Sequence, residues 1–320
     1  MKAIVYRHFG SPDVLRCEEV DQPVPRDGEV LIRVHAAGLN PLDWRLMEGD
    51  PAFVRLLAGR EKLKRPGRDV AGLIEAVGAG VTQFKPGDAV FGTCRGALAE
   101  FVCTPASAVA MKPENVTFEQ AASVPVAAFT ALQGLRDKGN VQPGQKVLIN
   151  GAAGGVGTFA VQIAKYYGAA VTGVCSTRNG ELVRSIGADR VIDYTQEDFA
   201  AGHERYDAIL DCHVNHALSA VRRVLKPRGA YVIIGGPSGG SLAILGGMVA
   251  LLVLAPFTKQ KLGTMMARAN QADLNLLGEL MQSGKVTPVM DRCYTLGEAA
   301  DAMRYLEQGH ARGKVVVTVP

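Results

Sequence analysis

The sequence has few cysteines, and no two of them stand at the spacing of a metal-binding or redox pair. Its six cysteines are scattered over 320 residues, and none is separated from the next by only two residues. A disulfide-rich secreted domain, a four-cysteine zinc site and a CxxC redox motif are therefore not expected. The opening residues, MKAIVYR, have the pattern of a strand and not of a signal peptide. We expect a cytoplasmic protein.

A strong surplus of charge is also absent. The formal net charge is +4, which is small for this length and argues against nucleic acid as the main partner. With 48% hydrophobic and 21% charged residues, the composition is that of an ordinary globular protein. The length allows two domains of about 150 residues each.

One stretch lacks charge altogether. Residues 229–258 contain no charged side chain, and residues 242–256 are almost wholly aliphatic. A transmembrane helix needs about 20 apolar residues, and this run is shorter. We expect it to be buried or to lie in a subunit interface, which favours a homodimer, with peripheral membrane contact as the alternative.

A glycine-rich turn follows an apolar strand expected at residues 147–149. The turn and the first residues of the following helix are Ala153, Gly154, Gly155, Val156 and Gly157. Gly154 would let the backbone approach a pyrophosphate, Gly157 would let the helix pack on its strand, and the helix N-terminus would supply N–H groups. A second strand is expected at residues 170–174. This βαβ unit predicts a dinucleotide-binding site.

The segments on either side have different patterns. Residues 1–37 and 66–104 have short apolar runs and closely spaced glycines, typical of a small β-rich domain, with a loop expected at 36–44. Further helices are expected at 117–138, 181–186, 216–225, 272–283 and 296–308, and further strands at 190–193, 206–211, 230–234 and 314–319. The alternation after residue 146 predicts a parallel doubly wound sheet.

Several blocks of sequence, spread over nearly the whole chain, match one known family in their order. They are Gly38-Leu39-Asn40-Pro41-x-Asp43, Gly67-x-Asp69-x-Ala71-Gly72, Val77-Gly78 through Gly87-Asp88-x-Val90-x-Gly92, Ala152 to Gly157, Gly187-Ala188-Asp189-x-Val191-Ile192-Asp193-Tyr194 and Arg312-Gly313-Lys314-Val315-Val316. These blocks resemble the medium-chain dehydrogenase/reductase superfamily, in its zinc-independent quinone oxidoreductase-like branch.

The resemblance implies an α/β fold in which a Rossmann-type doubly wound parallel sheet is inserted in a GroES-like β-rich catalytic domain. The expected boundaries are 1–122 for the catalytic domain, 123–262 for the NADP-binding domain, and 263–320 for the return to the catalytic domain. Such proteins reduce quinones or α,β-unsaturated carbonyls with NADPH, often as homodimers. Some members serve instead as crystallins, RNA-binding or membrane-trafficking-associated proteins, so a non-catalytic NADPH-binding protein is the alternative. The phosphate-binding turn and the Asn40 segment favour an enzyme.

Zinc is not expected. In zinc-dependent relatives a cysteine stands at the position of Asn40 and a histidine at that of Arg68, and a guanidinium has no lone pair for a metal. Cys212, His213 and His216 are the alternative cluster, at the end of the strand expected at 206–211.

The cofactor expected from the sequence is NADP. The second strand of the βαβ unit ends in Ser176, Thr177 and Arg178, with no carboxylate to hold ribose hydroxyls. By resemblance, Lys165 and Tyr194 join Ser176 and Arg178 around the 2′-phosphate, although Lys165 also suits a solvated helix end and Tyr194 an ordinary strand end. The resemblance extends the expected cofactor contacts further, to Gly235, Arg312, Gly313 and Lys314.

Asn40 is the candidate catalytic residue. Its amide could donate to a substrate carbonyl without titrating, and the alternative role is to cap the turn before Pro41. Many relatives carry a tyrosine soon after this Asn-Pro, whereas this chain has Trp44 and Arg45. The sequence therefore names no proton donor.

Overall fold

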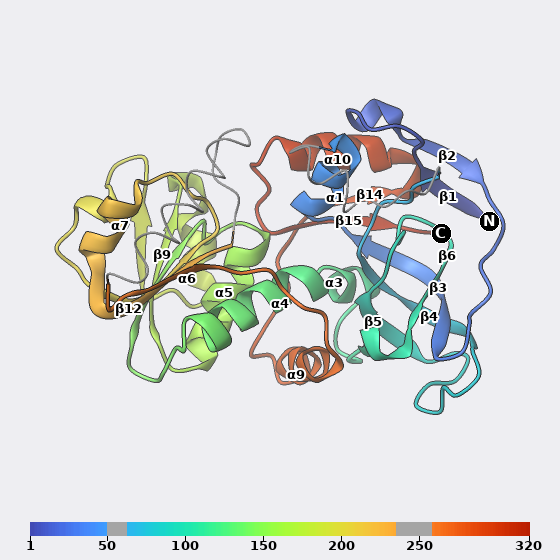
Figure 1. The fold of residues 1–320 in the computed structure, drawn as a ribbon, viewed down its shortest axis with the longest axis horizontal. Helices are drawn as coiled ribbons and strands as arrows, with labels where there is room; N and C mark the ends of the chain where they lie inside the picture. Colours follow the sequence, from blue (N-terminus) through green and yellow to red (C-terminus); the bar gives the residue numbers. More distant parts are fainter. Residues whose placement is uncertain (50–62, 235–257) are drawn as a thin grey trace. The chain divides into compact units, whose positions relative to one another are not determined.

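The computed structural model describes residues 1–49, 63–234 and 258–320. The chain divides into two compact units, of which the first comprises residues 1–127 and 268–320 and the second residues 128–267. The second unit thus interrupts the first, and Figure 1 shows the blue and red ends of the chain together in the first unit. Both boundaries lie five residues later than the sequence placed them.

The first unit is built on a seven-stranded sheet. Its order is β14-β15-β3-β4-β5-β7, with β6 beside β3, and only the β14–β15 pair is parallel. The strands are β3 (Glu29–Gly38), β4 (Asp69–Val77), β5 (Ala89–Thr93), β6 (Phe101–Pro105), β7 (Val109–Met111), β14 (Met290–Thr295) and β15 (Lys314–Thr318). A small second sheet pairs β1 (Lys2–Val5) with β2 (Arg16–Glu19). Because Val316 pairs with Gly38, the start of β15 lies beside the end of β3.

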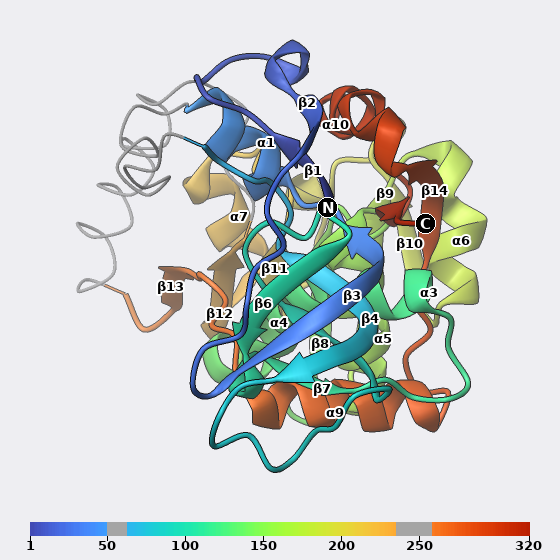
Figure 2. The same ribbon diagram turned by 90° about the vertical axis from the view of Figure 1, so that its right-hand side faces the viewer.

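Helices cover this sheet and complete its core. They are α1 (Pro41–Glu48), α3 (Phe118–Ala122), α9 (Gln271–Gln282) and α10 (Ala299–Glu307), with short 3-10 turns η1 (Pro12–Val14), η2 (Ala106–Ala108) and η7 (Leu296–Glu298). The C-terminal α10 packs against β15 and α1 (Figure 1), and α9 packs against β7 (Figure 2). Buried side chains such as Ile32, Val70 and Met303 join both parts of the chain in one core.

The prediction of a loop at residues 36–44 is wrong, because the chain enters α1 at Pro41. Asn40 has extended dihedral angles at the N-cap, Pro41 stands at the first helical position, and Asp43 accepts a hydrogen bond from the backbone N–H of Asn40 at 2.8 Å. Proline at this position and an acidic residue in the first turn are start signals of a helix. The sequence contained these signals, and they outweigh the turn tendency of Asn-Pro.

The second unit is a six-stranded parallel sheet in the order β10-β9-β8-β11-β12-β13. The strands are β8 (Lys146–Asn150), β9 (Ala170–Cys175), β10 (Arg190–Asp193), β11 (Tyr206–Asp211), β12 (Leu225–Ile233) and β13 (Lys261–Thr264). In chain order this is 3-2-1-4-5-6, the arrangement that binds dinucleotides outside the carboxyl ends of the strands. The predicted doubly wound sheet is confirmed.

The helices of the second unit are short apart from the one that follows β8. They are α5 (Gly155–Tyr166), α6 (Gly180–Ser185) and α7 (Leu218–Val224), with 3-10 turns η4 (Thr177–Asn179) and η5 (Phe199–Ala201). The single helix expected at residues 117–138 is wrong. The segment forms α3, then α4 (Pro125–Gln133), then the π-helix η3 (Gly134–Lys138). Proline disfavours a helical conformation of the residue before it, which explains the break at Val124.

Candidate functional site

The glycine-rich turn joins the carboxyl end of β8 to α5. Gly154 is the N-cap of α5, and Gly157 lies in its first turn. A Cβ on Gly157 would lie 2.1 Å from the carbonyl oxygen of Gly151, whereas one on Gly154 would meet only that same oxygen, at 3.4 Å. Gly157 is therefore required for close packing of the helix. Gly154 keeps space open beside the helix N-terminus, where a phosphate would be bound by backbone N–H groups.

Three of the predicted phosphate contacts meet at the same edge of the sheet. Asp193 pairs with Cys175 in the parallel register, and the backbone N–H of Tyr194 donates to the carbonyl of Cys175 at 3.0 Å. Tyr194 therefore lies beside Ser176 and Arg178, which follow β9. The glycine turn is held at this edge too, because Ala152 N–H donates to the carbonyl of Val174 at 3.0 Å.

A carboxylate that the sequence analysis did not assign also lies at this edge. Asp193 ends β10, and its Oδ2 accepts a hydrogen bond from the Thr177 hydroxyl at 2.5 Å. Thr195 and Gln196 donate to the same carboxylate. The hydrogen bond from Thr177, followed by that from Thr195, lowers the pKa of Asp193 below its ordinary value. The pairing of β9 with β10, visible in the sequence only as two successive strands, is what brings Asp193 here.

The assignment of Lys165 to the phosphate is wrong. Its Nζ lies 2.8 Å from both carboxylate oxygens of Asp189, and Asp189 also accepts the backbone N–H of Val171. Val171 stands near the start of β9, so this pair lies at the amino edge of the sheet. Ten residues of helix separate Lys165 from Gly155, which is about 15 Å along the axis. The resemblance implied the contact of Lys165, although the glycine turn already assigns the cofactor to the N-terminus of this helix and Lys165 lies in its last turn.

The remaining predicted cofactor contacts are not in the described part of the second unit. Gly235 lies outside the described residues, as does the aliphatic run 242–256. Arg312 and Gly313 belong to the first unit, where the backbone N–H of Arg312 donates to Asp291 at 2.9 Å. Gly313 has a φ of +101°, and a Cβ there would lie 2.3 Å from the carbonyl oxygen of Val289. Glycine is thus required at 313 by the backbone, and cofactor contact at Arg312 and Gly313 stays a prediction.

Asn40 is part of a buried polar network in the first unit. Only 3% of the residue is exposed. Its side-chain Nδ2 donates to Asp69 at 2.9 Å, and its Oδ1 accepts from the ammonium of Lys314 at 2.7 Å. An amide nitrogen carries two hydrogens, and Asp69 accepts one of them. The turn-capping alternative also holds, because Asn40 is the N-cap residue of α1 and forms a capping box with Asp43, while its side chain is hydrogen-bonded to β4 and β15 as well.

Lys314 is consequently not placed to hold a cofactor, and that assignment is wrong. Its ammonium is buried and donates to the carbonyl of Leu39 at 2.9 Å, to Asn40 at 2.7 Å and to Asp69 at 3.2 Å. A lysine has three N–H donors, and these acceptors use all of them. The resemblance identified the block that contains Lys314 but could not show that the side chain points into the core.

Two further ionisable groups interact with this network, Asp43 through its hydrogen bond with Asn40 and Tyr6 through the charge of Asp43. Asp43 is 3% exposed, and burial, followed in the same direction by the charge of Asp69, raises its pKa to about 6, although the hydrogen bond from Asn40 opposes this shift. Tyr6 is also buried; burial and then the charge of Asp43 raise its pKa to about 12. The sequence alone did not suggest a role for either residue. The Asn-Pro-x-Asp spacing was the available signal for Asp43, because it is the spacing of a helix N-cap and its third residue.

The alternative metal cluster does not form. Both ring nitrogens of His216 are engaged, Nε2 with Asp198 at 2.8 Å and Nδ1 with Asn215 at 2.7 Å. Within residues 1–49, 63–234 and 258–320, no group of three or more His, Cys, Asp and Glu side chains is arranged to hold a metal ion.

A second buried network stands beneath the carboxyl edge of the parallel sheet. Asn150, at the end of β8, donates to Asp211 at 2.8 Å and to the carbonyl of His213 at 2.8 Å. Tyr231 donates to the other oxygen of Asp211 at 2.7 Å. These contacts fix the ends of β8, β11 and β12 relative to one another and so support the start of the glycine turn.

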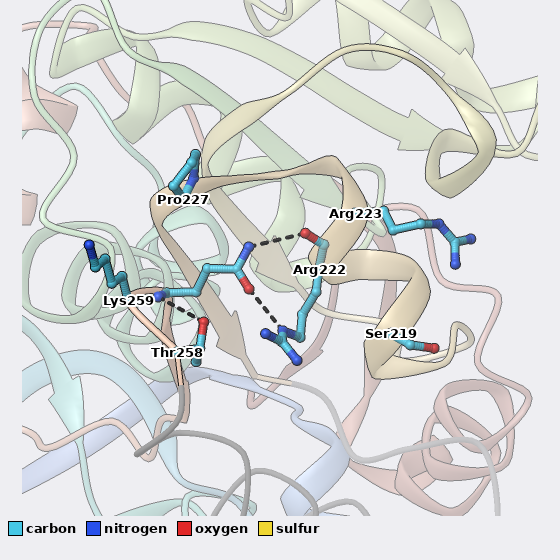
Figure 3. Close-up of a pocket in the computed structure, with 7 residues that line it drawn as sticks. Ser219, Arg222, Arg223, Pro227, Thr258 and Lys259 are labelled. Atoms are coloured by element: carbon cyan, nitrogen blue, oxygen red, sulfur yellow. Dashed lines mark hydrogen bonds between the residues drawn. The ribbon is translucent and has the colours of Figure 1, made fainter.

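A basic hollow of about 540 Å³ lies at a different place in the second unit (Figure 3). It is lined by α7, the start of β12 and the segment before β13, and Arg222, Arg223 and Lys259 contribute its positive charge. Arg222 is held by Gln260, which accepts from its Nε at 2.9 Å. The start of β12 is at the amino edge of the parallel sheet. The hollow is therefore separate from the edge where Ser176 and Tyr194 lie.

No described helix combines the length and apolar character needed to cross a membrane.

Two family models match the chain. The alcohol dehydrogenase GroES-like domain matches residues 26–114, and the zinc-binding dehydrogenase model matches residues 186–317. The first falls on the β-rich unit that holds Asn40.

Curated proteins and solved structures are similar to the chain over its whole length. The 2-methylene-furan-3-one reductase of Solanum lycopersicum is 36% identical over 99% of this chain and 79% of its own length. A chloroplastic NADPH-dependent alkenal/one oxidoreductase of Arabidopsis thaliana is 35% identical over 99% of this chain and 79% of its own. The quinone oxidoreductase structure from Coxiella burnetii has a TM-score of 0.87 at 33% identity and covers 100% of this chain and 99% of that one.

Proposed function

Because the chain belongs to the medium-chain dehydrogenase/reductase superfamily, as a quinone oxidoreductase-like enzyme that uses a nicotinamide cofactor, we propose that it reduces quinones or α,β-unsaturated carbonyls with NADPH and without zinc. The names of three similar proteins support the substrate class, since one is a methylene-furanone reductase, one an alkenal/one oxidoreductase, and one a quinone oxidoreductase. Each of these substrates contains an electrophilic carbon in a double bond that is conjugated to a carbonyl group.

The observation that carries the cofactor choice is the edge formed by β9 and β10. Ser176 supplies a hydroxyl and Arg178 a permanently charged guanidinium directly after β9, and Tyr194 lies beside them. A planar guanidinium can donate two parallel hydrogen bonds to a phosphate. The nearby Asp193 carboxylate accepts four hydrogen bonds, from the hydroxyl of Thr177, the hydroxyl and backbone N–H of Thr195 and the amide of Gln196, so its acceptor sites are already used. This edge suits a 2′-phosphate better than a free ribose hydroxyl pair.

The glycine turn would bind the pyrophosphate. The structure leaves space over Gly154 at the N-terminus of α5, and the residues present therefore fit a dinucleotide. When bound, the nicotinamide supplies the hydride, and the protein supplies position and hydrogen-bond donors.

Without zinc, negative charge that develops on the conjugated oxygen needs another donor. We assign this role to Nδ2 of Asn40, which carries two hydrogens and gives one of them to Asp69. The donor set argues against zinc, because an amide and a guanidinium stand at positions 40 and 68, where zinc-dependent relatives have a cysteine and a histidine.

The test is an absorbance assay of NADPH consumption against a panel of quinones, alkenals and alkenones, with saturated ketones as the control panel. We expect turnover of the conjugated substrates and little turnover of the saturated ones. The proposal fails if none of the conjugated substrates is reduced, or if the saturated ketones are reduced at the same rate.

A further inference from the structure

The ammonium of Lys314 is completely enclosed by acceptors of the first unit. It stands at the start of β15 and is 3% exposed, with Leu39, Asn40 and Asp69 as its three partners. Asp69 is fully buried at the start of β4, and its other oxygen accepts the backbone N–H of Val126 at 3.0 Å. The buried ion pair thus joins segments that are more than 240 residues apart in sequence.

These partners determine the orientation of the Asn40 amide. An ammonium can only donate, so the atom that faces Lys314 must be the amide oxygen; an ionised Asp69 can only accept, so the atom that faces it must be the amide nitrogen. Turning the amide by 180° would break both hydrogen bonds. It would place two donors, Nδ2 and the Lys314 ammonium, against each other, and two acceptors, Oδ1 and the Asp69 carboxylate, against each other. The second hydrogen of Nδ2 therefore has a fixed direction.

The same partners strengthen Asn40 as a donor. Hydrogen bonds in a chain polarise one another, and the positive charge at Oδ1 withdraws electron density from the amide nitrogen. A buried cation within 2.7 Å of Oδ1 has this effect on Nδ2, which is the atom assigned to the substrate oxygen. Burial raises the pKa of Asp69 from its ordinary value, and the charge of Lys314 opposes that effect and favours the ionised form.

We propose that Lys314 and Asp69 are positioning residues that hold and polarise the Asn40 amide so that one Nδ2 hydrogen points to the reacting oxygen. This inference rests on the proposed function, because it presumes that Asn40 donates to the substrate. In this account Lys314 affects turnover only through Asn40 and has no direct contact with the cofactor.

A double-mutant cycle on the full-length protein tests the inference. Asn40→Ala should lower kcat with a conjugated enone by about 10- to 1000-fold, the loss expected for one oxyanion donor. Lys314→Met should lower kcat by about 10-fold or more and leave the KM for NADPH within about 2-fold. Because both act on one donor, Asn40→Ala/Lys314→Met should be no slower than Asn40→Ala alone. Lys285→Met, an exposed lysine of the same unit, is the matched control.

Two results would contradict the positioning role of Lys314. If the two losses multiply, Lys314 does not act through Asn40; if Lys314→Met mainly raises the KM for NADPH, it is a cofactor contact after all. Lys314→Met leaves the Asp69 carboxylate buried without its cation, which endangers folding. Lys314→Met/Asp69→Asn removes both charges and so leaves no unpaired ion in the core. In this variant too, a lower kcat supports the positioning role, and a higher KM for NADPH contradicts it.

A spectroscopic measurement separates this inference from the proposed function. The side-chain amide signals of Asn40 in ¹⁵N-labelled protein are identified by their loss in Asn40→Ala. In Lys314→Met/Asp69→Asn they should shift and exchange faster with solvent, whatever substrate the enzyme uses. Unchanged signals would overturn the positioning role, whereas changed signals in a protein that reduces no conjugated substrate would overturn the proposed function alone.

Discussion

Tyr194 donates its backbone N–H to the carbonyl of Cys175, and this single 3.0 Å contact joins the ends of two neighbouring parallel strands. It brings Tyr194 beside Ser176 and Arg178, while the glycine turn is attached to the same edge through Val174. Parallel strands end at the same edge of a sheet, so residues that follow β8, β9 and β10 meet there although the ends of β8 and β10, Asn150 and Asp193, are 43 positions apart in the chain. The cofactor assignment depends on this edge.

The two glycines of the turn should respond differently to alanine. Gly157→Ala places a methyl group where the Gly151 carbonyl oxygen lies 2.1 Å away, and should lower the free energy of unfolding of the second unit by about 1 to 3 kcal/mol. Gly154→Ala, the matched control, has 3.4 Å to the same oxygen and should cost less than about 1 kcal/mol while weakening cofactor binding. Urea unfolding with and without NADPH measures both. Equal destabilisation by the two substitutions would contradict the packing account.

Asp43 should make stability depend on pH in the mildly acidic range. Its pKa is raised to about 6 in the folded protein, against about 3.9 in an unfolded chain. Between these values the folded state holds a proton that the unfolded state has released, so stability falls as pH rises from about 4 to about 6. The loss is about 3 kcal/mol for this group.

Asp43→Asn should remove that dependence. The asparagine side chain keeps an oxygen that can accept the Asn40 N–H, and it has no proton to lose. Relative to wild type, the variant should therefore gain stability between pH 4 and pH 7. Urea unfolding at both values is the measurement, and a difference from wild type that stays constant with pH would show that Asp43 does not titrate as described.

Zinc should be absent from the active protein. We expect elemental analysis of the purified protein to find no stoichiometric zinc, and chelators to leave NADPH-linked turnover intact. About one zinc per chain would overturn this proposal. The residues to replace first would then be Cys212 and His213, since the ring nitrogens of His216 are bonded to Asp198 and Asn215.

The uncharged run of residues 242–256 should determine how the protein associates. We propose a homodimer that buries part of this run or the edge of the parallel sheet, because an exposed apolar surface of that length would promote association. Light scattering at micromolar concentration should give twice the mass of one chain. A monomer would count against the dimer, and co-sedimentation with liposomes would favour peripheral membrane binding instead.

Much of the second unit could be predicted from the sequence because its signals are local. The strand at 206–211 was predicted with its observed bounds, and the turn from Gly154 to Gly157 has the arrangement that its spacing indicated. Lys165 was assigned wrongly. It was assigned by resemblance, whereas the glycine turn puts the cofactor at the N-terminus of α5 and Lys165 lies in the last turn of that helix.

The polar network of the first unit was harder to predict from the sequence, because it forms between segments that are distant in the chain. Asn40 was recognised as a candidate, yet its partners Asp69 and Lys314 come from β4 and β15, and only sheet pairing brings them together. The resemblance implied a cofactor contact for Lys314, whereas the structure shows an ammonium with three protein acceptors. Local sequence carries no information about such pairing.

Titration of NADPH and NADH into wild-type protein and Arg178→Ala tests the central claim most directly. A hydrogen bond to a charged group contributes about 1.5 to 3 kcal/mol, so the substitution should weaken NADPH binding by about 10- to 150-fold and leave NADH binding nearly unchanged. Arg223→Ala, at the amino edge of the same sheet, should change neither. Wild-type protein that prefers NADH, or equal losses for both cofactors in Arg178→Ala, would contradict the assignment of this edge to the 2′-phosphate.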